Sequence, residues 1–344
     1  MLLGLMPGRI SAGTIRDDRD PQLYLNLGAA PQYASVGKFD LTKWEPGFGA
    51  SGTLIENNWV LTAAHVMDGT ASAQFTVGGR TYGVSKWITH PKWDNALRRG
   101  YDLALVKLDA SVSNVAPATL YTGHQELGAT ATFVGFGRTG TGATGYTADF
   151  DGLKRAGTNT IDGTLGPEPW PLPATFKDKL PKGARTLVSD FDNPTNARDS
   201  VTGSASPTDL EYLISLGDSG GGAFADFGKG PQLVGIHSFA EIPDGVDDSD
   251  YGDVIGDVRV SAFAKWIRTT LKHEDKAEAA ALRRETRVAR LAASRLTSGA
   301  QRIFSPDSLA VVSPDTGAST VPEPAGVTLV LAAAAFSLPR RRRP

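Results

Sequence analysis

Three short segments of the sequence each place one reactive side chain in a setting that suits acyl transfer. His65 follows the apolar run WVLTAA, Asp102 precedes the apolar run LALVKL, and Ser219 lies in the glycine-rich segment GDSGGGAF. A serine hydroxyl becomes an effective nucleophile when an imidazole removes its proton, and a buried carboxylate orients that imidazole. We therefore predict a catalytic triad of His65, Asp102 and Ser219.

The glycines beside Ser219 suit a second requirement of this chemistry, an oxyanion hole. Glycine lets the backbone turn sharply and brings N–H groups close to the substrate carbonyl, whose oxygen becomes negative in the transition state. We predict that Gly217 and Ser219 supply the two N–H donors. No metal ion or organic cofactor is needed for such a mechanism.

Each of these assignments has competitors. A lone histidine after a strand, or a serine in a glycine-rich turn, is also compatible with a core or turn residue. Asp68 and Asp94 are rival carboxylates near Asp102 in the sequence. We prefer Asp102 because the apolar residues that follow it predict a buried strand, which would hold the carboxylate out of water.

Two other serine-hydrolase folds also have to be weighed. The residues around Ser219 match the G-x-S-x-G elbow of α/β-hydrolases, and His237 and His273 lie downstream as that fold requires. However, the elbow leads into a long helix, whereas the residues after Ser219 predict another strand. The subtilisin order needs an acidic partner before His65 in a βαβ pattern, which this chain lacks.

Composition limits the classes of function. The chain has 344 residues with 39 glycines, 40% hydrophobic and 21% charged residues, which indicates a soluble, turn-rich globular protein. Its net charge of −2 provides no basic surface for nucleic acid. Cysteine is absent, so a disulfide, a thiolate metal site and a thiol nucleophile are excluded.

The elements that position the triad are predicted to be short strands. Between Phe39 and Thr132 the runs SGTLI, NWVLTAA, SAQFTVGG and DLALVKL are separated by turn signals. The second half repeats this texture with ATATFVGFG, GGAFADF, QLVGIHSF and VIGDVRV. Regularly spaced short strands favour barrels or sandwiches, and we predict two β-barrels that face each other across a cleft.

The order and spacing of these motifs resemble those of the chymotrypsin-like (trypsin-fold) serine proteases over residues 30–270. The matching segments are TAAH, YDLAL, GDSGG, FVGFG, VGIHSF and the closing VSAFAKWI. The resemblance implies an all-β fold of two six-stranded antiparallel β-barrels, at about 30–125 and 126–260, with a C-terminal helix. It also implies a serine endopeptidase that acts through an acyl-enzyme, with His65 and Asp102 on the first barrel and Ser219 on the second.

Further roles are implied by the same resemblance. Asp218 corresponds to the aspartate that organises the oxyanion loop. Leu213 corresponds to the base of the primary specificity pocket, and Ser238, Phe239 and Ala240 correspond to the wall that pairs with extended substrate. An apolar residue at the pocket base disfavours lysine or arginine in the substrate, so we expect a preference for an apolar and small side chain rather than trypsin-like specificity.

Activation departs from the family pattern. Family zymogens release an Ile-Val-like N-terminus that pairs with the aspartate corresponding to Asp218. This chain has no such motif, and the nearest candidate, Ile15, is followed by Arg16 and Asp17. Either another group satisfies Asp218 or the chain is processed elsewhere.

The flanking segments are interpreted separately. Residues 1–29 are predicted to be a truncated signal or ordinary N-terminal segment, because the apolar stub at Leu2–Met6 is short and has no basic residue before it. From Ser261 the composition predicts a long helix, which continues as a basic extension over 271–297, and residues 298–320 predict a linker. The extension suits a solvated or self-associating helix, with binding to a polyanion as the alternative.

The last residues, 321–344, resemble the PEP-CTERM sorting signal of exported bacterial proteins. VPEP precedes an apolar run, Ala325–Leu338, and four arginines follow at 340–343. Fourteen helical residues span about 21 Å, short of the ~30 Å hydrocarbon core, which favours a transient inner-membrane anchor over a permanent one. We therefore expect cleavage by an exosortase-like sorting transpeptidase, followed by release to the cell surface or the extracellular space.

Two non-enzymatic alternatives and one metal hypothesis stay open. The protease-like domain could be a catalytically silent binding module, or a module displayed at the surface whose tail is its main function. The acidic run DGVDDSDYGD at 244–253 offers carboxylate and carbonyl oxygens to Ca²⁺, but its spacing fits no loop template. A solvated loop is the preferred interpretation of that run, and no metal site is assigned.

Overall fold

The computed structural model describes residues 13–43, 49–148, 150–165, 176–177, 180 and 183–303. It contains two compact units, the first ending at Lys276 and the second beginning at Ala277. Residues 1–12 of the predicted N-terminal segment, residues 304–320 of the predicted linker and the sorting tail at 321–344 lie outside the described residues. Residues 298–303, predicted as the start of the linker, belong instead to a helix that ends at Ile303, because the helical pattern continues past residue 297.

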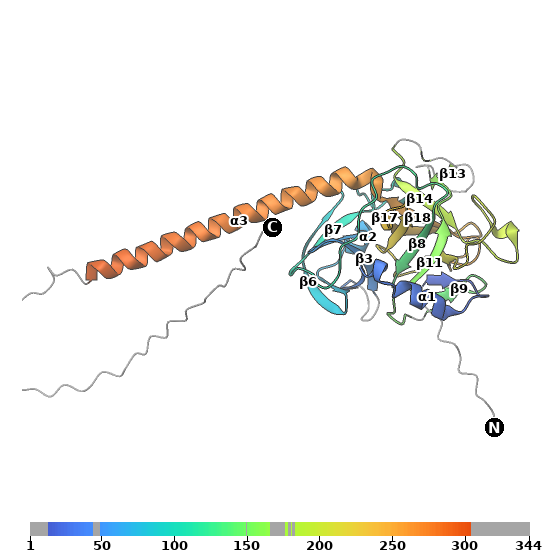
Figure 1. The fold of residues 1–344 in the computed structure, drawn as a ribbon, viewed down its shortest axis with the longest axis horizontal. Coiled ribbons are helices and arrows are strands. Elements are labelled where there is room, and N and C mark those ends of the chain that lie inside the picture. Colours follow the sequence, from blue (N-terminus) through green and yellow to red (C-terminus); the bar gives the residue numbers. More distant parts are fainter. Residues whose placement is uncertain are drawn as a thin grey trace, which may run out of the picture. The chain divides into compact units, whose positions relative to one another are not determined.

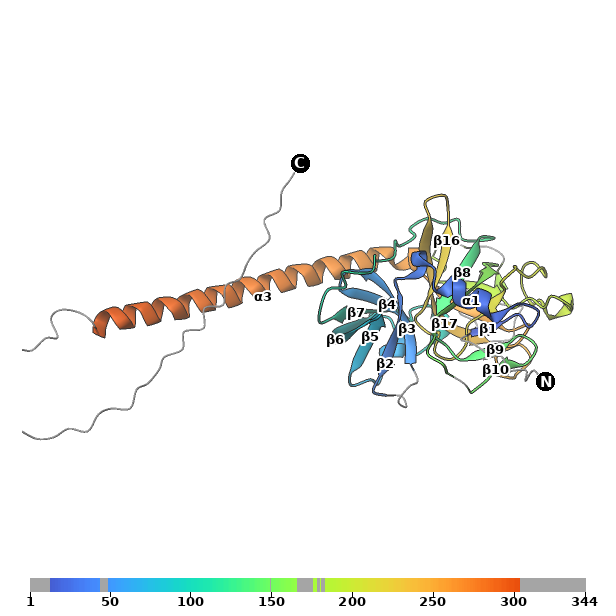
Figure 2. The same cartoon turned by 60° about the horizontal axis from the view of Figure 1, so that its bottom comes forward.

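The first half of the first unit is a closed, antiparallel six-stranded barrel, visible as the blue to cyan strands in Figure 2. Its strands are β2 (Val36–Leu41), β3 (Gly49–Glu56), β4 (Trp59–Thr62), β5 (Ala73–Val77), β6 (Arg80–Thr89) and β7 (Ala104–Leu108), closed in the order β2-β3-β4-β7-β6-β5. Apolar side chains from all six strands fill the interior, where the rings of Phe39 and Phe75 lie 4.7 Å apart. All four residues of β4 are buried. The six strands of this barrel lie between Val36 and Leu108.

The second half is a curled six-stranded sheet, seen beside the barrel in Figure 1. Its order is β11 (Arg155–Thr160), β8 (Thr130–Gly135), β16 (Gly222–Asp226), β17 (Pro231–Glu241), β18 (Val254–Arg259) and β14 (Thr186–Asp190). The edge strands β11 and β14 are not paired as a ladder. They meet through one bridge, Gly163 to Val188, and through the Asn159 side chain, whose Nδ2 donates to the Asp190 carbonyl at 2.7 Å.

The predicted fold is therefore confirmed with one refinement: the second six-stranded unit is a half-barrel rather than a closed barrel. The reason is that β11 ends at Thr160, so the chain that continues toward β14 carries only the bridge residue Gly163. A side-chain amide replaces part of the missing ladder.

A smaller sheet joins the N-terminal residues to the region before Ser219. Its order is β10 (Gly145–Tyr146), β9 (Thr139–Thr141), β1 (Gly13–Ile15) and β15 (Tyr212–Leu213). β1 runs antiparallel to β15 and parallel to β9. The helix α1 (Pro21–Gly28) follows, capped by Asp20, whose Oδ1 accepts from the Gln22 N–H at 2.9 Å. Ile15 and Tyr24 are buried, so residues 13–29 belong to the folded unit although the predicted protease domain starts at residue 30.

Short elements complete the first unit. They are the hairpin strands β12 (Thr164–Leu165) and β13 (Phe176–Lys177), the helix α2 (Ala64–Met67), and the 3₁₀ turns at Pro31–Tyr33, Leu97–Arg99 and Ala197–Asp199. Of these, α2 bears most directly on the site because it carries His65.

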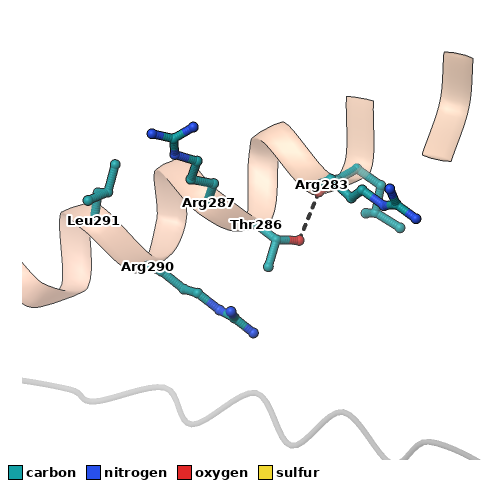
Figure 3. Close-up of a pocket in the computed structure, with 6 residues that line it drawn as sticks. Arg283, Thr286, Arg287, Arg290 and Leu291 are labelled. Carbon is teal, nitrogen blue, oxygen red and sulfur yellow. Dashed lines mark hydrogen bonds between the residues drawn. The ribbon is translucent and has the colours of Figure 1, made fainter. Parts of the chain in front are cut away.

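The helix α3 spans Val260–Ile303, as the period change at Ser261 predicts. Its first turns bury Phe263 and Ile267, and Ser261 Oγ donates to the buried Glu126, which also pairs with Arg259 at 2.8 Å. In the second unit, arginines alternate with exposed Leu282, Val288 and Leu291, and Figure 3 shows Arg283, Arg287 and Arg290 extending from the helix. Within the described residues, no helix is long and apolar enough to cross a membrane.

Candidate active site

His65 and Asp102 are joined by two hydrogen bonds. His65 Nδ1 lies 2.7 Å from Asp102 Oδ2, and the His65 backbone N–H donates to Asp102 Oδ1 at 2.8 Å. The carboxylate side chain is fully buried while the imidazole side chain is 27% exposed. Because the same aspartate binds both the ring and the backbone of His65, it fixes the orientation of the ring and leaves the other ring nitrogen, Nε2, outside this contact.

The strands that flank these residues explain their placement. β4 ends at Thr62, and α2, which carries His65, follows it directly. β7 begins two residues after Asp102 and pairs with β4, so that Thr62 lies opposite Ala104. The buried Leu103 and Ala104 keep water from the carboxylate. The rival acids are engaged elsewhere, because Asp68 accepts from Trp93 Nε1 at 2.5 Å and Asp94 pairs with Arg99.

Ser238 completes the surroundings of Asp102. Its Oγ donates to Asp102 Oδ2 at 2.6 Å, across 136 residues of sequence. A buried carboxylate needs several donors to remain ionised at low cost, and Asp102 receives the His65 backbone N–H, the His65 ring and this hydroxyl. The resemblance places Ser238 in the substrate wall, and the structure adds a hydrogen bond to the acid.

Ser219 lies in the turn between β15 and β16, partly exposed, and this turn is fixed to the first barrel. The Ser51 N–H on β3 donates to the Ser219 carbonyl at 2.9 Å. Gly220 has a φ of +82°, and a Cβ there would fall 2.0 Å from Thr62 Oγ1. Glycine is therefore required for the Ser219 turn to pack on the strand that leads to His65.

The backbone carbonyl directly before each of the two predicted oxyanion donors is held in place by a hydrogen bond. The carbonyls of Leu216 and Asp218 accept from the N–H groups of Arg138 (2.7 Å) and Gly221 (2.8 Å). Since the N–H of a trans peptide points opposite its carbonyl, these bonds orient the N–H groups of Gly217 and Ser219 away from Arg138 and Gly221. Gly217 itself has a φ of +103°, which favours glycine.

Ser51 is a functional residue that the sequence did not reveal. Besides its backbone bond to Ser219, its Oγ donates to the Gly217 carbonyl at 3.0 Å and accepts from the Phe136 N–H at 3.0 Å. A serine in a predicted strand gives no local signal of such a role, because its partners are 85 and 166 residues away in the chain.

Asp218 is fully buried beneath this turn. Its Oδ1 accepts from the Gly137 N–H at 2.8 Å and its Oδ2 from the Ser215 N–H at 2.9 Å. Burial raises the pKa of Asp218, and the two amide donors oppose that increase. Ser215 Oγ also donates to the Arg138 carbonyl at 2.5 Å, which ties the segment before Ser219 to the loop after β8.

The predicted substrate-binding residues occupy different environments. Leu213 is fully buried in the core of the second half, and its backbone pairs with Thr14 of β1. Phe239 is also largely buried, and its ring packs over Gly256, the residue paired with it on β18. A Cβ at Gly256 would lie 2.2 Å from that ring. Ala240 is partly exposed at the end of β17.

A second histidine–aspartate pair lies apart from the first. His237 Nδ1 is 2.8 Å from Asp257 Oδ1, the ring is fully buried, and Nε2 has no hydrogen-bond partner. The alternative α/β-hydrolase order would use His237 or His273, but His273 is exposed on α3 and the residues after Ser219 form the strand β16 instead of a helix. The structure therefore removes that alternative.

Comparison with known proteins agrees with this geometry. Residues 30–164, which include His65 and Asp102, match the Trypsin family model. This part of the chain is therefore similar to the trypsin-like serine proteases. It is 36% identical over 93 residues to chymotrypsin-like elastase family member 1 of the dog, covering 24% of this chain and 33% of that protein.

Two further matches are to serine proteases. Serine proteinase stubble of Drosophila melanogaster is 31% identical over 136 residues, covering 34% of this chain and 17% of that protein. The matches therefore span a third or less of these curated relatives. A solved structure of neuropsin, a serine protease of mouse brain, aligns with a TM-score of 0.49 at 17% identity over 71% of this chain and 97% of that one.

The environment of Ile15 bears on the question of activation that the resemblance raised. Its side chain is 1% exposed and its backbone pairs with Tyr212 and Thr141 inside the four-stranded sheet. Meanwhile both oxygens of Asp218 are satisfied by amides of Gly137 and Ser215. Of the two possibilities left open by the sequence, the structure corresponds to the one in which other groups satisfy Asp218.

Lys43 is a second residue that the motifs missed. Its Nζ donates to the carbonyls of His65 at 2.6 Å and Asp68 at 2.8 Å, which caps the short helix α2. Desolvation lowers its pKa. A positive charge at this position complements the negative C-terminal end of the helix that carries His65.

Proposed function

We propose that this protein is a serine endopeptidase that hydrolyses peptide bonds through an acyl-enzyme on Ser219. The observation that carries the proposal is the buried Asp102, which binds the ring of His65 and the hydroxyl of Ser238 while the Ser219 turn packs on the same barrel. An aspartate that only stabilised the fold would not need an exposed imidazole as its partner. A partly exposed imidazole bound to a buried acid suits proton transfer to and from a hydroxyl.

In the proposed reaction, His65 takes the Ser219 proton as the hydroxyl attacks the scissile carbonyl. Asp102 keeps the imidazole in the required tautomer and stabilises its positive charge. The N–H groups of Gly217 and Ser219 bind the oxygen of the tetrahedral intermediate. His65 then protonates the leaving amine, and a water molecule hydrolyses the acyl-enzyme by the same steps in reverse.

We propose a preference for apolar rather than basic side chains at the cleavage site. The residues that lead to the Ser219 turn, Leu213 and Ile214, are apolar and buried, and Phe239 and Ala240 form the facing wall by family correspondence. A carboxylate that could pair with substrate lysine or arginine is absent from these four positions. Cleavage-site profiling on a peptide library tests this, and dominant cleavage after lysine or arginine would refute it.

The nucleophile assignment is tested with Ser219→Ala, using Ser113→Ala as a control at an exposed serine of the same unit. A fluorophosphonate probe should label the parent and the control and leave Ser219→Ala unlabelled. Peptide hydrolysis should fall by several orders of magnitude with unchanged thermal stability. A parent protein that folds but is neither labelled nor active would favour the silent binding module.

We further propose that the chain is exported and that residues 321–344 are a sorting signal. Support comes from the sequence alone: VPEP, an apolar run and four arginines in that order. In a host with matching sorting machinery, mass spectrometry should find a mature C-terminus near Glu323 or Pro324. Recovery of a peptide containing Ala325–Leu338 from fully exported protein would refute a cleaved signal.

A further inference from the structure

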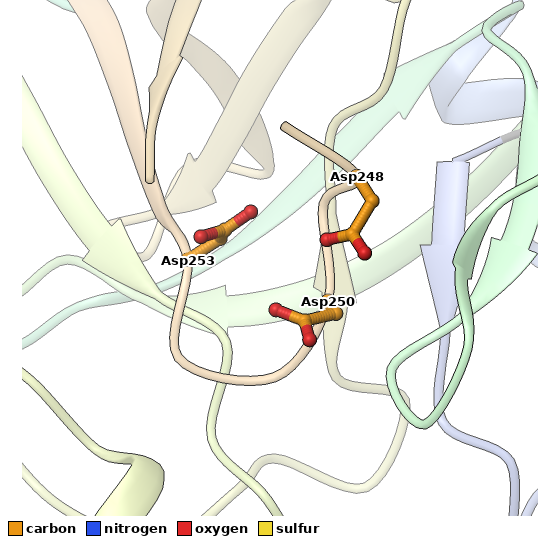
Figure 4. Close-up of side chains that lie close together, drawn as sticks. All are labelled: Asp248, Asp250 and Asp253. Carbon is orange, nitrogen blue, oxygen red and sulfur yellow. The ribbon is translucent and has the colours of Figure 1, made fainter. Parts of the chain in front are cut away.

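Three aspartates of the loop between β17 and β18 converge on one point. Asp248, Asp250 and Asp253 each turn a carboxylate oxygen into a common space, and these oxygens lie within 4.8 Å of one another (Figure 4). No other group of three or more such ligands is found in the described part of the chain. Acidic groups of this kind are common on protein surfaces, so convergence by itself proves little.

The burial of Asp253 is what distinguishes this cluster. Its residue is 1% exposed, and both of its carboxylate oxygens are buried without a hydrogen-bond partner. Asp248 Oδ1 is likewise buried and unpartnered. A buried carboxylate that lacks donors and a counter-charge is among the most unfavourable groups that a fold can contain.

The charges that act most strongly on Asp253 increase this cost. The carboxylates of Asp250, Asp244 and Asp248 lie near Asp253 and carry charge of the same sign, so they repel a charge there. No arginine or lysine is among the strongest influences on Asp253. A cation at the centre of the three carboxylates would supply the missing charge and the missing partners together.

The backbone around the cluster is already ordered by contacts on both sides. The Asp248 carbonyl accepts from the Tyr146 N–H, the Asp253 carbonyl accepts from the Phe191 N–H at 2.9 Å, and the Tyr251 N–H donates to the Gly142 carbonyl at 2.9 Å. Tyr251 Oη also donates to Asp17 at 2.7 Å. The three carboxylates therefore project from a fixed frame, which suits preorganised metal binding.

We propose that Asp248, Asp250 and Asp253 form a calcium site that fixes the loop after the substrate wall. The ligand set consists of hard oxygen atoms without histidine, and this chain has no cysteine, so zinc and copper are disfavoured. Two oxygens bound to one Ca²⁺ at about 2.4 Å each lie at most about 4.8 Å apart. That limit accommodates the whole cluster.

The site connects two parts of the proposed machinery. The loop begins directly after Phe239 and Ala240 of β17 and ends at β18, and its contacts reach Gly142, Tyr146 and Asp17. Calcium would therefore order the end of the substrate wall and hold the N-terminal residues beside it. The binding itself does not depend on the proposed function.

The test uses full-length Ser219→Ala protein, which prevents self-cleavage and keeps the result separate from enzymatic activity. After treatment with chelator, thermal unfolding is measured in buffer alone, in CaCl₂ and in MgCl₂, and calorimetric titration with CaCl₂ gives the stoichiometry. We expect one Ca²⁺ per chain and a rise in Tm of several degrees, because a ligand of the native state stabilises it. Mg²⁺ should stabilise less.

Asp253→Asn is the decisive variant, and Asp247→Asn is its control, because Asp247 is exposed on the same loop and carries the same charge. Asp253→Asn should lose the calcium response while equalling or exceeding the parent Tm in chelator, since it removes a buried carboxyl group that has no hydrogen-bond partner. Asp247→Asn should respond like the parent. Absence of a calcium effect on the parent, equal stabilisation by Mg²⁺, or an unchanged response in Asp253→Asn would overturn the proposal.

If Asp253→Asn does not fold, Asp250→Asn decides the question, because Asp250 is partly exposed and better placed to tolerate substitution. Removal of one of three charged ligands should weaken Ca²⁺ binding by at least about tenfold. Unchanged affinity in a folded Asp250→Asn protein would also overturn the proposal.

Discussion

The hydroxyl of Ser238 donates to the same oxygen of Asp102 that binds the His65 ring, at 2.6 Å, so one carboxylate oxygen joins the two halves of the first unit. Ser238 lies on β17 of the half-barrel, whereas Asp102 precedes β7 of the closed barrel. The position of the acid is thus set by both halves. This bond is fully inside the protein.

Ser238→Ala tests the contribution of this bond. A hydrogen bond to a buried charge contributes about 1.5–3 kcal/mol, so we expect kcat to fall by about tenfold or more with a smaller change in KM. Kinetics normalised by active-site titration measure the effect. In an Asp102→Asn background the same substitution should cost much less, since its charged acceptor is gone. Equal losses in both backgrounds would mean that Ser238 acts independently of Asp102.

Gly220→Ala should damage the active site, whereas Gly230→Ala should not. The two glycines have nearly equal φ values, +82° and +81°. A Cβ at Gly220 falls 2.0 Å from Thr62 Oγ1, but a Cβ at Gly230 meets open space. The two substitutions therefore cause similar backbone strain. Only the new methyl group in Gly220→Ala would displace the Ser219 turn from β4.

We expect Gly230→Ala to lose about 1 kcal/mol of unfolding free energy and to keep its activity. Gly220→Ala should lose more stability and nearly all fluorophosphonate labelling. Chemical denaturation and labelling rates measure both effects. Comparable labelling of the two variants would show that the contact with Thr62 does not position Ser219.

The unprocessed full-length chain should be active. Both carboxylate oxygens of Asp218 already accept amide N–H groups, from Gly137 and Ser215, so a newly released N-terminal ammonium is not needed to order the turn. Active-site titration of protein whose intact mass has been verified measures this. Labelling confined to molecules cleaved just before Ile15 would contradict it.

Glu211→Gln should flatten the pH dependence of stability. Desolvation raises the pKa of Glu211 to about 8, while its Oε2 accepts from Thr208 N–H and Oγ1. An acid whose pKa is higher in the folded state binds more protons there, so the free energy of unfolding falls as pH rises from about 4.5 toward 8. Glutamine keeps an oxygen acceptor and removes this ionisation.

Urea denaturation at several pH values checks the Glu211 prediction. Between about pH 5 and pH 8 the parent should lose on the order of 2 kcal/mol more stability than the variant. Some decline should persist in the variant, because burial also raises the pKa of Asp162 to about 8 and that of Asp192 to about 7. Parallel curves for parent and variant would show that Glu211 does not titrate in this range.

Local patterns predicted the parts of the fold and site that depend on nearby residues. His65 follows a buried strand and Asp102 precedes one, so their motifs indicated both residues before any contact was known. The alternation of short strands likewise predicted the barrel, and the change of period predicted α3.

Contacts that join distant residues were not predictable in this way. Nothing beside Ser51 in the sequence indicates its bond to Gly217, because that bond exists only once the half-barrel packs on β3. The same holds for β1, whose three residues lack any strand pattern and are ordered by pairing with Tyr212 and Leu213. The gap between β11 and β14 arises because β11 ends at Thr160, and that end point depends on how the sheet curls rather than on the local sequence.

Ser51 also links parts of the chain that are synthesised at different times. It comes from the part of the protein that is made first, yet its partners Gly217 and Ser219 lie in the part that is made later. A growing chain folds its N-terminal portion before the rest has left the ribosome. The closed barrel can therefore form first with Ser51 in place, and the Gly217–Ser219 turn gains its bonds to Ser51 only when the later part of the chain packs there. An incomplete chain that ends before this turn carries His65 and Asp102 without Ser219.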